Sequence, residues 1–420
     1  MQLTNKQEEG LKIAVDRYNI GMPYTCISGY AGSGKSTLVK FIVSALDIDP
    51  EDVAYVAYTG KAANVLKNKG CPNATTAHKL LYYANKDKNG IFHFKPRPRL
   101  EHDYKLIVVD EVSMLPDEIW YQLLTHGVYV LAMGDPGQLP PVKGQAAPIL
   151  DNPHVFLDEI MRQAQESAII RLSMHIREGK DFRQFPTVSG EVRIIPHKFQ
   201  FVDENTALLQ ANQVICGTNA ERNRLNNKIR ALQGRGSEPE IGDKIICLDN
   251  HWEEISVEGN ALTNGAIGTT PGYTLVMQDY PATNKLYKDF QPTQLMMSSF
   301  NTDDGDTFIR ELPIDYKCLV TGEPSLTPKQ EAIIAHNQKM LINKMMNDPY
   351  FTDIHRFWKE LPYHFNYGYA ITCWKAQGSE YQYVLGYEAN WLKQRDPEQY
   401  KKYLYTLVTR ASQAIILVGD

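Results

Sequence analysis

The stretch Gly29-Tyr30-Ala31-Gly32-Ser33-Gly34-Lys35-Ser36-Thr37 fits the pattern G-x-x-x-x-G-K-[ST] without a gap. A short apolar run from Tyr24 to Ile27 precedes it and a helix-like run from Leu38 to Val43 follows, which is the strand–loop–helix setting that the pattern requires. Glycines let backbone N–H groups crowd around a polyphosphate, and the helix turns its positive end toward the anion. Lys35 is then placed to reach the β- and γ-phosphates, and the Ser36 hydroxyl to hold Mg²⁺. The stretch predicts a nucleotide-phosphate site rather than a chance glycine-rich turn.

Acidic and amide side chains follow two further apolar strands. Leu106 to Val109 reads as a buried parallel strand, and Asp110 and Glu111 stand at its carboxyl end. Beside a phosphate loop, Asp110 can bind Mg²⁺ through water, and Glu111 can take a proton from the attacking water or orient it. A third strand, from Val128 to Ala132, leads into Gly134-Asp135-Pro136-Gly137-Gln138, where Gln138 can sense the γ-phosphate.

Composition limits the classes of protein that the chain can belong to. Its 420 residues predict about two to four domains, and 43% hydrophobic with 22% charged residues describe a soluble globular protein. The net charge of −5 weighs against a broad basic face that coats nucleic acid, although a narrow positive groove remains compatible with it. The six cysteines include no C-x-x-C pair, which indicates a reduced intracellular compartment. We expect no signal peptide and no membrane-spanning segment.

Alternating strand and helix patterns indicate the α/β class, with two interruptions. A second α/β run opens at Val214 and closes with Ile415 to Val418. Between about residues 267 and 365 the periodicity changes to strand patterns at 273–277 and 307–309, followed by a helical pattern at 329–346. These patterns predict a small β-barrel with a helical extension.

The second interruption spans residues 82–100. Asn89-Gly90 is a strong hairpin-turn signal, and Ile91 to Phe94 alternate after it. The hairpin is either surface decoration or an aromatic wedge against a nucleic-acid base pair.

Several polar residues stand where phosphate or sugar contacts are common. Thr59, Lys61, Thr76 and His78 lie at strand-to-helix turns, where they are either ordinary turn and cap residues or contacts to nucleic acid. Gln7 lies one helix before the phosphate loop. It is either a surface glutamine or an amide that pairs with the N6 and N7 edge of adenine.

The order of the motifs carries a resemblance that no single motif carries alone. A helical glutamine, the phosphate loop, T-G-K-A-A, T-T-A-H-K-L-L, V-V-D-E, G-D-P-G-Q-L-P-P, M-R-Q, T-x-x-K-A-Q-G-S-E and L-V-T-R-A-S follow one another over nearly the whole chain. This order resembles the superfamily 1 helicases, and within them the RecD-like branch, superfamily 1B, which translocates 5′ to 3′.

The resemblance implies two tandem RecA-like P-loop motor domains with two insertions. The first motor domain would comprise residues 1–81 and 101–150, and the second residues 151–266 and 366–420. Residues 82–100 would form a strand-separating pin, and residues 267–365 an SH3-like domain with a helical extension.

The resemblance also implies ATP and Mg²⁺ as ligands and assigns the site. Gln7 would read adenine, Glu111 would activate water, and Gln138 would couple the γ-phosphate to DNA. Ser36 and Asp110 would hold the metal, and Arg162 and Arg410 would be arginine fingers from the second motor domain. The remaining nucleotide contacts would come from Gly32, Ser33, Gly34, Lys35, Thr37, Gly378 and Glu380, with Glu380 at the ribose.

For nucleic acid, the resemblance implies single-stranded DNA and fork DNA as partners. The residues that would hold the DNA backbone are Thr59, Lys61, Thr76, His78, Thr372 and Lys375. Phe92 and Phe94 would form the tip of the pin. Trp374 stands where related enzymes often carry histidine, so it could stack on a base instead. We expect a monomer in the cytoplasm of a bacterium or a phage-infected host, with replication or recombination proteins as further partners.

Three other functions compete with this interpretation. Backbone contacts alone say little about the sugar, so an RNA-directed helicase is one alternative. An ATP-gated remodeller that grips nucleic acid without processive unwinding is another. A P-loop kinase for a small molecule fits poorly with Arg162, Arg410 and a second α/β half.

Overall fold

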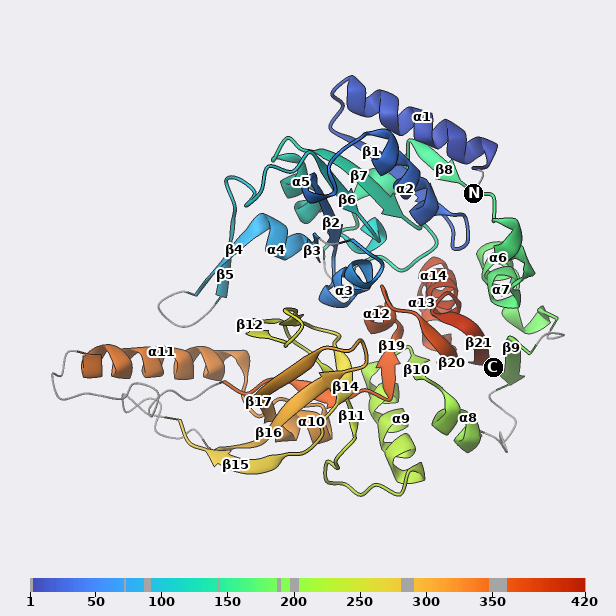
Figure 1. The fold of residues 1–420 in the computed structure, drawn as a ribbon. Helices are drawn as coiled ribbons and strands as arrows, with labels where there is room; N and C mark the ends of the chain where they lie inside the picture. The colour runs from blue at the N-terminus through green and yellow to red at the C-terminus, as the bar shows by residue number, and fades with distance from the viewer. Residues whose placement is uncertain are drawn as a thin grey trace. The chain divides into compact units, whose positions relative to one another are not determined.

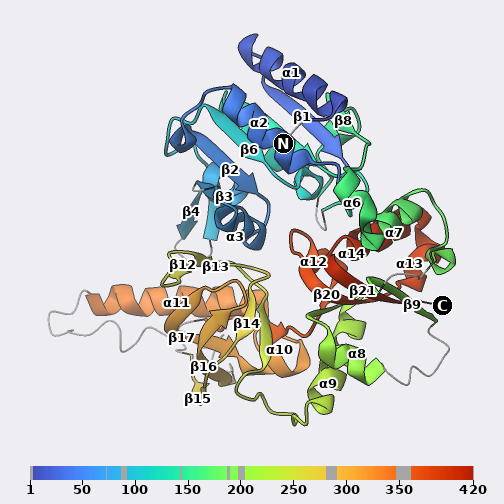
Figure 2. The ribbon, with the colours of Figure 1, turned by 45° about the vertical axis from the view of Figure 1, so that its right-hand side comes forward.

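The computed structural model describes residues 3–71, 73–86, 92–141, 144–186, 190–196, 204–280, 291–346 and 361–419. Within helices and strands, the side chains of residues 84–86, 92–94, 162–163, 196, 252, 339 and 341–346 are outside the description. The chain divides into two compact units (Figures 1 and 2). One comprises Met1–Leu81, Pro98–Gln233 and Tyr369–Asp420, and the other Tyr82–Arg97 and Gly234–Gly368.

The first unit contains two parallel sheets, and the first sheet carries the phosphate loop. Its six strands lie in the order β3-β2-β6-β7-β1-β8, and every neighbouring pair is parallel. Their bounds are β1 (Tyr24–Gly29), β2 (Val53–Ala57), β3 (Ala74–Thr76), β6 (Leu106–Val109), β7 (Tyr129–Gly134) and β8 (Val155–Leu157). The parallel strands predicted before Asp110 and before Gly134 are confirmed, and they are neighbours in the sheet.

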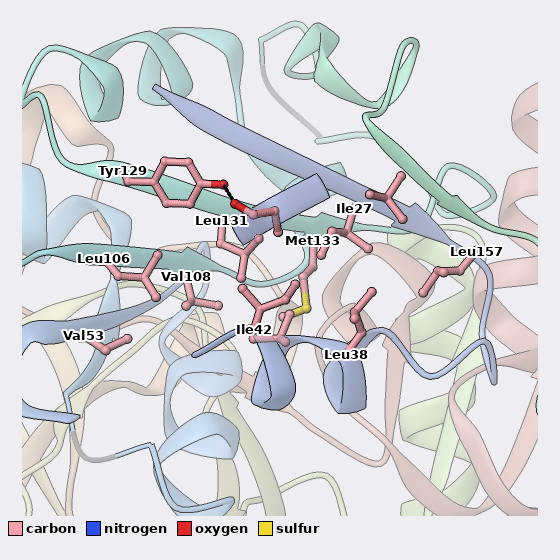
Figure 3. Close-up of a cluster of buried hydrophobic side chains, with 13 residues drawn as sticks. Ile27, Leu38, Ile42, Val53, Leu106, Val108, Tyr129, Leu131, Met133 and Leu157 are labelled. Atoms are coloured by element: carbon pink, nitrogen blue, oxygen red, sulfur yellow. Dashed lines mark hydrogen bonds between the residues drawn. The ribbon is translucent and has the colours of Figure 1, made fainter. Parts of the chain in front are cut away.

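Helices α1 and α2 pack into one apolar cluster with this sheet (Figure 3). Leu38 and Ile42 of α2 are fully buried among Ile27 and Leu131, and burial of each such side chain contributes about 1.5–3 kcal/mol. Tyr129 anchors α1 by donating a hydrogen bond of 2.9 Å to the carbonyl of Ala14. The helices of this half are α1 (Asn5–Asn19), α2 (Lys35–Ala45), α3 (Gly60–Asn68), α4 (Ala77–Leu81) and α5 (Asp117–Leu124).

The second sheet has five parallel strands in the order β19-β10-β20-β21-β9. Their bounds are β9 (Val192–Pro196), β10 (Gln213–Cys216), β19 (Ala370–Thr372), β20 (Tyr381–Tyr387) and β21 (Ala411–Gly419). Helices α8 and α9 cover one face, and α7 and α14 the other (Figure 2). The helices are α6 (Arg162–Glu166), α7 (Ala168–Arg177), α8 (Glu204–Gln210), α9 (Asn219–Leu232), α12 (Cys373–Ala376), α13 (Asn390–Arg395) and α14 (Pro397–Val408). Together the two sheets form a two-domain RecA-like fold.

The second unit is built on an antiparallel sheet. Strands β15, β16, β14, β11 and β18 lie side by side in that order, and β17 pairs with β16. The bounds are β11 (Lys244–Cys247), β14 (Ile267–Thr269), β15 (Thr274–Gln278), β16 (Thr293–Thr302), β17 (Thr307–Asp315) and β18 (Phe365–Tyr367), with β12 (His251–Ile255) paired to β13 (Ala261–Leu262). Helices α10 (Tyr316–Thr321) and α11 (Pro328–Met346) follow β17. The strands predicted at 273–277 and 307–309 and the helix predicted at 329–346 are present.

Strand pairing places some segments differently from the predicted domain limits. Strand β8 pairs with β1, so the first sheet extends beyond residue 150. Strands β11 and β18 pair with each other, so residues 244–247 and 366–367 lie in the antiparallel sheet instead of the second motor half. The physical reason is that a short apolar strand fits either kind of sheet, and only its partner decides between them.

A two-stranded antiparallel hairpin occupies the segment predicted as a hairpin. Strand β4 (Tyr82–Lys86) pairs with β5 (Phe92–Pro96) from Tyr82↔Pro96 to Lys86↔Phe92. Arg97 closes its base, since Nε donates to the Tyr82 carbonyl at 3.1 Å and the guanidinium lies 4.2 Å from the Tyr83 ring centre. The predicted turn at Asn89-Gly90 lies outside the described residues.

The cysteines are reduced and most of them are buried, as the sequence predicts. All six cysteines are free, and only Cys71 is not buried. Within the described ranges, no helix combines the length and apolar character needed to cross a membrane.

A charged cluster in the second unit gives a testable pH dependence. His364 Nδ1 lies 2.6 Å from Asp249, and its Nε2 lies 3.3 Å from Glu331. Burial opposes the charge on the imidazole, but the two carboxylates outweigh it and raise the pKa of His364 to about 10. Because this pKa lies above the ordinary value of about 6.5, the stabilisation is complete below pH 6.5 and declines as the pH rises toward 10.

We therefore expect His364→Gln to lower the free energy of unfolding by about 1–3 kcal/mol at pH 6 and by less at pH 9. Urea unfolding at both pH values measures the difference. His102→Gln is the control, because the pair of His102 with Asp52 is more exposed and should contribute little. A loss for His364→Gln that is equal at both pH values would contradict the assigned charge.

Candidate active site

The phosphate loop joins β1 to α2 in a conformation that depends on glycine. Gly32 and Gly34 have φ values of 78° and 80°, and Gly34 is the residue that caps α2. A Cβ atom at Gly34 would lie 2.5 Å from Nε2 of Gln7. The loop therefore leaves the first N–H groups of an 11-residue helix free of side-chain caps, which is the arrangement that binds a phosphate.

Lys35 folds back over this loop. Its Nζ donates hydrogen bonds to the carbonyls of Gly29 at 2.7 Å and Tyr30 at 3.0 Å. Its positive charge also acts on the carboxyl groups of Asp110 and Asp135. The ammonium group thus lies on the loop, and its charge favours the ionised forms of the carboxyl groups that follow β6 and β7.

Asp110 and Glu111 follow β6 as predicted. Burial, and then the charge of Glu111, raise the pKa of Asp110 to about 6, although Lys35 opposes this shift. The Glu111 N–H donates to the Asp110 carboxylate at 2.9 Å. Glu111 itself has a φ of 55°, a left-handed conformation that costs a non-glycine residue about 1–3 kcal/mol. Such strain is common where a side chain must be aimed at a reacting group.

The segment after β7 is held by residues of both sheets. Asp135 accepts hydrogen bonds from the Gly137 N–H at 2.9 Å and from the Tyr405 hydroxyl at 2.7 Å. The Leu139 N–H donates to Thr406 Oγ1 at 2.9 Å, and the Leu139 carbonyl accepts from Gln377 Nε2 at 2.8 Å. These bonds fix the G-D-P-G-Q-L-P-P segment against the second half, and the Gln138 side chain within this segment is buried.

Buried polar atoms around the loop fit ATP and Mg²⁺. Ser33 Oγ, Glu111 Oε2, Gln138 Oε1 and Ser379 Oγ are buried and have no hydrogen-bond partner within the described part of the chain. Buried polar atoms normally have one. A phosphate, a metal-bound water and an attacking water are the groups that such atoms would satisfy.

The structure describes the side-chain contacts of one predicted arginine finger, Arg410, but not those of the other, Arg162. Arg410 is buried and donates to the carbonyls of Thr406 at 3.1 Å and Ser379 at 3.0 Å, and to Thr409 Oγ1 at 3.2 Å. All three acceptors belong to its own half. Arg162 is the first residue of α6, and its side chain lies outside the described ones. The finger roles stay predictions.

Comparisons with known proteins find family models that match each half of the chain. Residues 2–195 match the family model described as an AAA domain, and residues 367–418 match the UvrD-like helicase C-terminal domain. The ATP-dependent RecD2 DNA helicase of Deinococcus radiodurans is 34% identical over 161 residues, covering 37% of this chain and 22% of that protein. The ATP-dependent DNA helicase dda of Enterobacteria phage T4 is 25% identical over 304 residues, covering 67% of this chain and 69% of that protein.

Solved structures show the same fold. Pif1 helicase from Bacteroides, in complex with ADP-AlF3 and ssDNA, matches with a TM-score of 0.51 and 17% identity over 99% of this chain and 92% of that one. Pif1 helicase from Candida albicans matches with a TM-score of 0.50 and 16% identity over 100% and 94% of the two chains. The chain is therefore similar to the RecD2 and Dda DNA helicases, shares the fold of Pif1 helicases, and contains an AAA domain followed by a UvrD-like helicase C-terminal domain.

Gln7 is buried, so the prediction of a surface glutamine is wrong. Its Nε2 donates at 3.4 Å to the carbonyls of both Ser33 and Gly34. Its Oε1 accepts from the Thr4 N–H at 3.0 Å in the capping box of α1. The amide therefore joins the first helix to the phosphate loop, and its reading of adenine stays a prediction.

Of the other predicted nucleotide contacts, Ser36 and Thr37 lie in the first turn of α2. Gly378 lies beside α3, since a Cβ atom there would be 3.0 Å from Cβ of Ala62. Glu380 is exposed two residues further on.

Residues predicted to hold DNA lie at the carboxyl ends of β2, β3 and β19. Thr59 Oγ1 caps α3 by accepting from the Ala62 N–H at 3.2 Å, and Thr76 Oγ1 accepts from the Lys79 N–H at 3.2 Å. The threonines thus act as cap residues, one of the two roles that the sequence left open. Thr372 is buried at the end of β19, directly before α12.

The basic and aromatic members of the set contact other side chains. Lys61 is buried, and its Nζ lies 3.4 Å from the Tyr381 hydroxyl of the second half. His78 lies beside Tyr58 with ring centres 5.8 Å apart, and burial lowers the pKa of His78. In α12, which also carries Lys375, Trp374 lies against Tyr403 with ring centres 5.9 Å apart. The side chains of Phe92 and Phe94 lie outside the described ones.

Sequence reasoning missed the residues that join the two halves. Tyr405 and Thr406 lie in α14 shortly before Arg410, and Gln377 lies in the K-A-Q-G-S-E segment. The quoted motifs contained Gln377 without a role for it. For Tyr405 the sequence gives no signal, because α14 contains two other tyrosines and periodicity does not tell which of them faces the loop.

Proposed function

We propose that the protein hydrolyses ATP with Mg²⁺, translocates 5′ to 3′ on single-stranded DNA and separates duplex with the β4–β5 hairpin as a wedge. The observation that most supports this proposal is that the phosphate loop, the Asp110–Glu111 pair and the Gln138 segment all follow the carboxyl ends of neighbouring strands of the first sheet. Residues of the second half donate hydrogen bonds to the segment around Gln138 or accept them from it. Binding or hydrolysis of the nucleotide would therefore alter contacts of both halves.

Lys35 would bind the β- and γ-phosphates, and Ser36 and Asp110 would hold Mg²⁺. When bound, Mg²⁺ would neutralise charge on the phosphate oxygens. Glu111 would accept the proton of the attacking water, because its Oε2 is buried and has no other partner among the described residues.

Arg162 and Arg410 would supply further positive charge from the second half, a contribution of about 10³–10⁵ in rate for arginine fingers. Arg410 would have to exchange its bonds to the carbonyls of Thr406 and Ser379 for a phosphate oxygen. That exchange would link nucleotide binding to movement of the segment around Ser379.

The DNA track would follow the carboxyl ends of the strands, where Thr59, Thr76 and Thr372 stand. Ligands of parallel sheets bind at this edge. Contacts to the phosphate backbone make the grip tolerant of sequence and sensitive to salt. Alternate gripping by two motor domains, one built on the sheet β3-β2-β6-β7-β1-β8 and the other on the sheet β19-β10-β20-β21-β9, would turn each cycle into a step.

The second unit would supply the parts that separate strands. We propose that residues 82–100 act as the pin and residues 267–365 as an SH3-like domain. The antiparallel hairpin and sheet found in these segments support both roles. We also propose a monomer in the cytoplasm, working on fork DNA with replication or recombination proteins.

Phe94→Ala tests the wedge. We expect the rate of duplex unwinding to fall about tenfold, because aromatic stacking contributes roughly 1–3 kcal/mol per base, while ATPase activity stimulated by single-stranded DNA stays unchanged. His93→Ala is the control, since His93 occupies the alternate position of the same strand. Equal loss of both activities in Phe94→Ala would argue against a wedge.

Partial duplexes with either a 5′ or a 3′ single-stranded tail test the main proposal. Unwinding with ATP of the 5′-tailed substrate alone is the expected result. Unwinding of the 3′-tailed substrate alone would reverse the polarity. ATPase stimulation by RNA rather than DNA would favour an RNA helicase, and stimulation without unwinding of either substrate would favour a remodeller.

A further inference from the structure

Tyr405 connects three segments that are far apart in the sequence. It lies in α14, which packs on the second sheet, and its side chain is buried. Its hydroxyl donates a hydrogen bond of 2.7 Å to Oδ2 of Asp135 and accepts one of 2.8 Å from the backbone N–H of Ala31. Ala31 is the third residue of the phosphate loop, and Asp135 directly follows β7. One hydroxyl group thus ties both nucleotide-binding segments of the first sheet to a helix of the second half.

The chemistry of this bridge requires a tyrosine. A phenol has one proton to donate and lone pairs to accept with, and both capacities are used here. Burial raises the pKa of Tyr405 well above its ordinary range, so the hydroxyl stays protonated. A hydrogen bond to a buried carboxylate is stronger than one between neutral groups. Phenylalanine keeps the ring and removes both bonds.

The surroundings hold the ring in one place. A Cβ atom at Gly137 would lie 3.0 Å from Cε1 of Tyr405, so no larger residue fits there without displacing the ring. On the loop side, the ring centre of Tyr30 lies 6.5 Å away, and the Arg177 guanidinium lies 3.7 Å from that of Tyr30. The next residue of α14, Thr406, bonds the Leu139 N–H. Two consecutive residues of α14, Tyr405 and Thr406, therefore form hydrogen bonds with loops that follow strands of the first sheet. They lie five and four positions before Arg410.

We propose that Tyr405 is a positioning residue for ATP hydrolysis, whose hydroxyl holds the phosphate loop and the Asp135 segment against α14, the helix that ends two residues before Arg410. This inference rests on the ATPase activity proposed above. Tyr405 acts through the phosphate loop and Asp135 and does not itself touch the nucleotide. The N–H groups of Gly34 and Lys35, which bind phosphate in such loops, lie outside the bridge.

Tyr405→Phe separates positioning from binding. We expect the kcat of ATP hydrolysis at saturating single-stranded DNA to fall about tenfold, the effect of losing a hydrogen bond to a charged group. The affinity for a fluorescent, non-hydrolysable ATP analogue without DNA should stay within about twofold of the unaltered protein. A merely structural role would not divide kcat from affinity in this way.

Tyr403→Phe is the matched control. Tyr403 lies in the same helix and is fully buried, but its hydroxyl donates at 2.7 Å to the Tyr387 carbonyl inside the second half. We expect Tyr403→Phe to keep kcat within about twofold of the unaltered protein. Its loss of thermal stability should be similar to that of Tyr405→Phe, because each variant loses buried hydrogen bonds. Equal loss of kcat in both variants would overturn the proposal, because it would indicate general loosening of α14.

Two further outcomes would also overturn the proposal. One is an unchanged kcat in Tyr405→Phe, and the other is a loss of analogue affinity as large as the loss of kcat. In each case the unaltered protein would still hydrolyse ATP, so the proposed function would stand. Absence of DNA-stimulated ATPase in the unaltered protein would reject the proposed function and this inference together.

Discussion

Lys35→Ala is expected to lower the kcat of ATP hydrolysis by about 10²–10³-fold and to abolish unwinding. The Lys35 ammonium lies 2.7 Å from the Gly29 carbonyl, and its charge reaches the carboxyl groups of Asp110 and Asp135. It is thus the cation at the centre of the loop, where negative charge develops on the transferred phosphoryl group. Release of phosphate, measured at saturating single-stranded DNA and ATP, gives the kcat.

Lys40→Ala is the control for this substitution. Lys40 lies on the same helix, is exposed, and carries the same charge away from the loop. We expect it to hydrolyse ATP at the unaltered rate. If Lys35→Ala retained more than about a tenth of the original kcat, this phosphate loop would not be the site at which ATP is hydrolysed.

Glu111→Gln is expected to bind ATP and fail to hydrolyse it. Glutamine has nearly the same shape as glutamate but cannot accept the proton of the attacking water, so kcat should fall by about 10²–10⁴-fold. The strained backbone at Glu111 supports a direct role in the chemistry, as does its buried Oε2, which has no hydrogen-bond partner among the described residues. Equilibrium binding of radiolabelled ATP, followed by single-turnover hydrolysis, separates the two steps.

Glu118→Gln controls for the loss of a negative charge near this site. Glu118 lies in the first turn of α5 and is exposed, so its variant should keep full activity. Normal turnover in Glu111→Gln would reject the role of this residue as the general base.

The local sequence pattern was sufficient to predict where the phosphate loop, Asp110 and Gln138 lie relative to the strands of the first sheet. The phosphate loop needs its glycines, its lysine, a preceding strand and a following helix, and all four are adjacent in the sequence. Asp110 and Gln138 could be predicted because each follows an apolar strand, and parallel strands bring their carboxyl ends to one edge. The alternating run beyond Asn89-Gly90 predicted an antiparallel hairpin for the same reason, since strand pairing there is local.

Contacts between distant segments could not be predicted in this way. The residues around Tyr405 do not indicate that its hydroxyl accepts a hydrogen bond from the Ala31 N–H, because the two residues are 374 positions apart in the sequence. Strand β11 has no sequence feature that favours an antiparallel partner over a parallel one. The burial of Gln7 depends on how α1 packs beside the loop. All three depend on tertiary packing, which overrides local preference.

The amide of Gln7 has a consequence for how the protein would distinguish one nucleoside triphosphate from another. That side chain shapes the phosphate loop through two carbonyls and is also the group predicted to meet the base. Discrimination between adenine and guanine would therefore not be separable from affinity for the triphosphate. Any evolutionary change in base preference at this position would have to keep the loop intact, which limits the residues that can replace it.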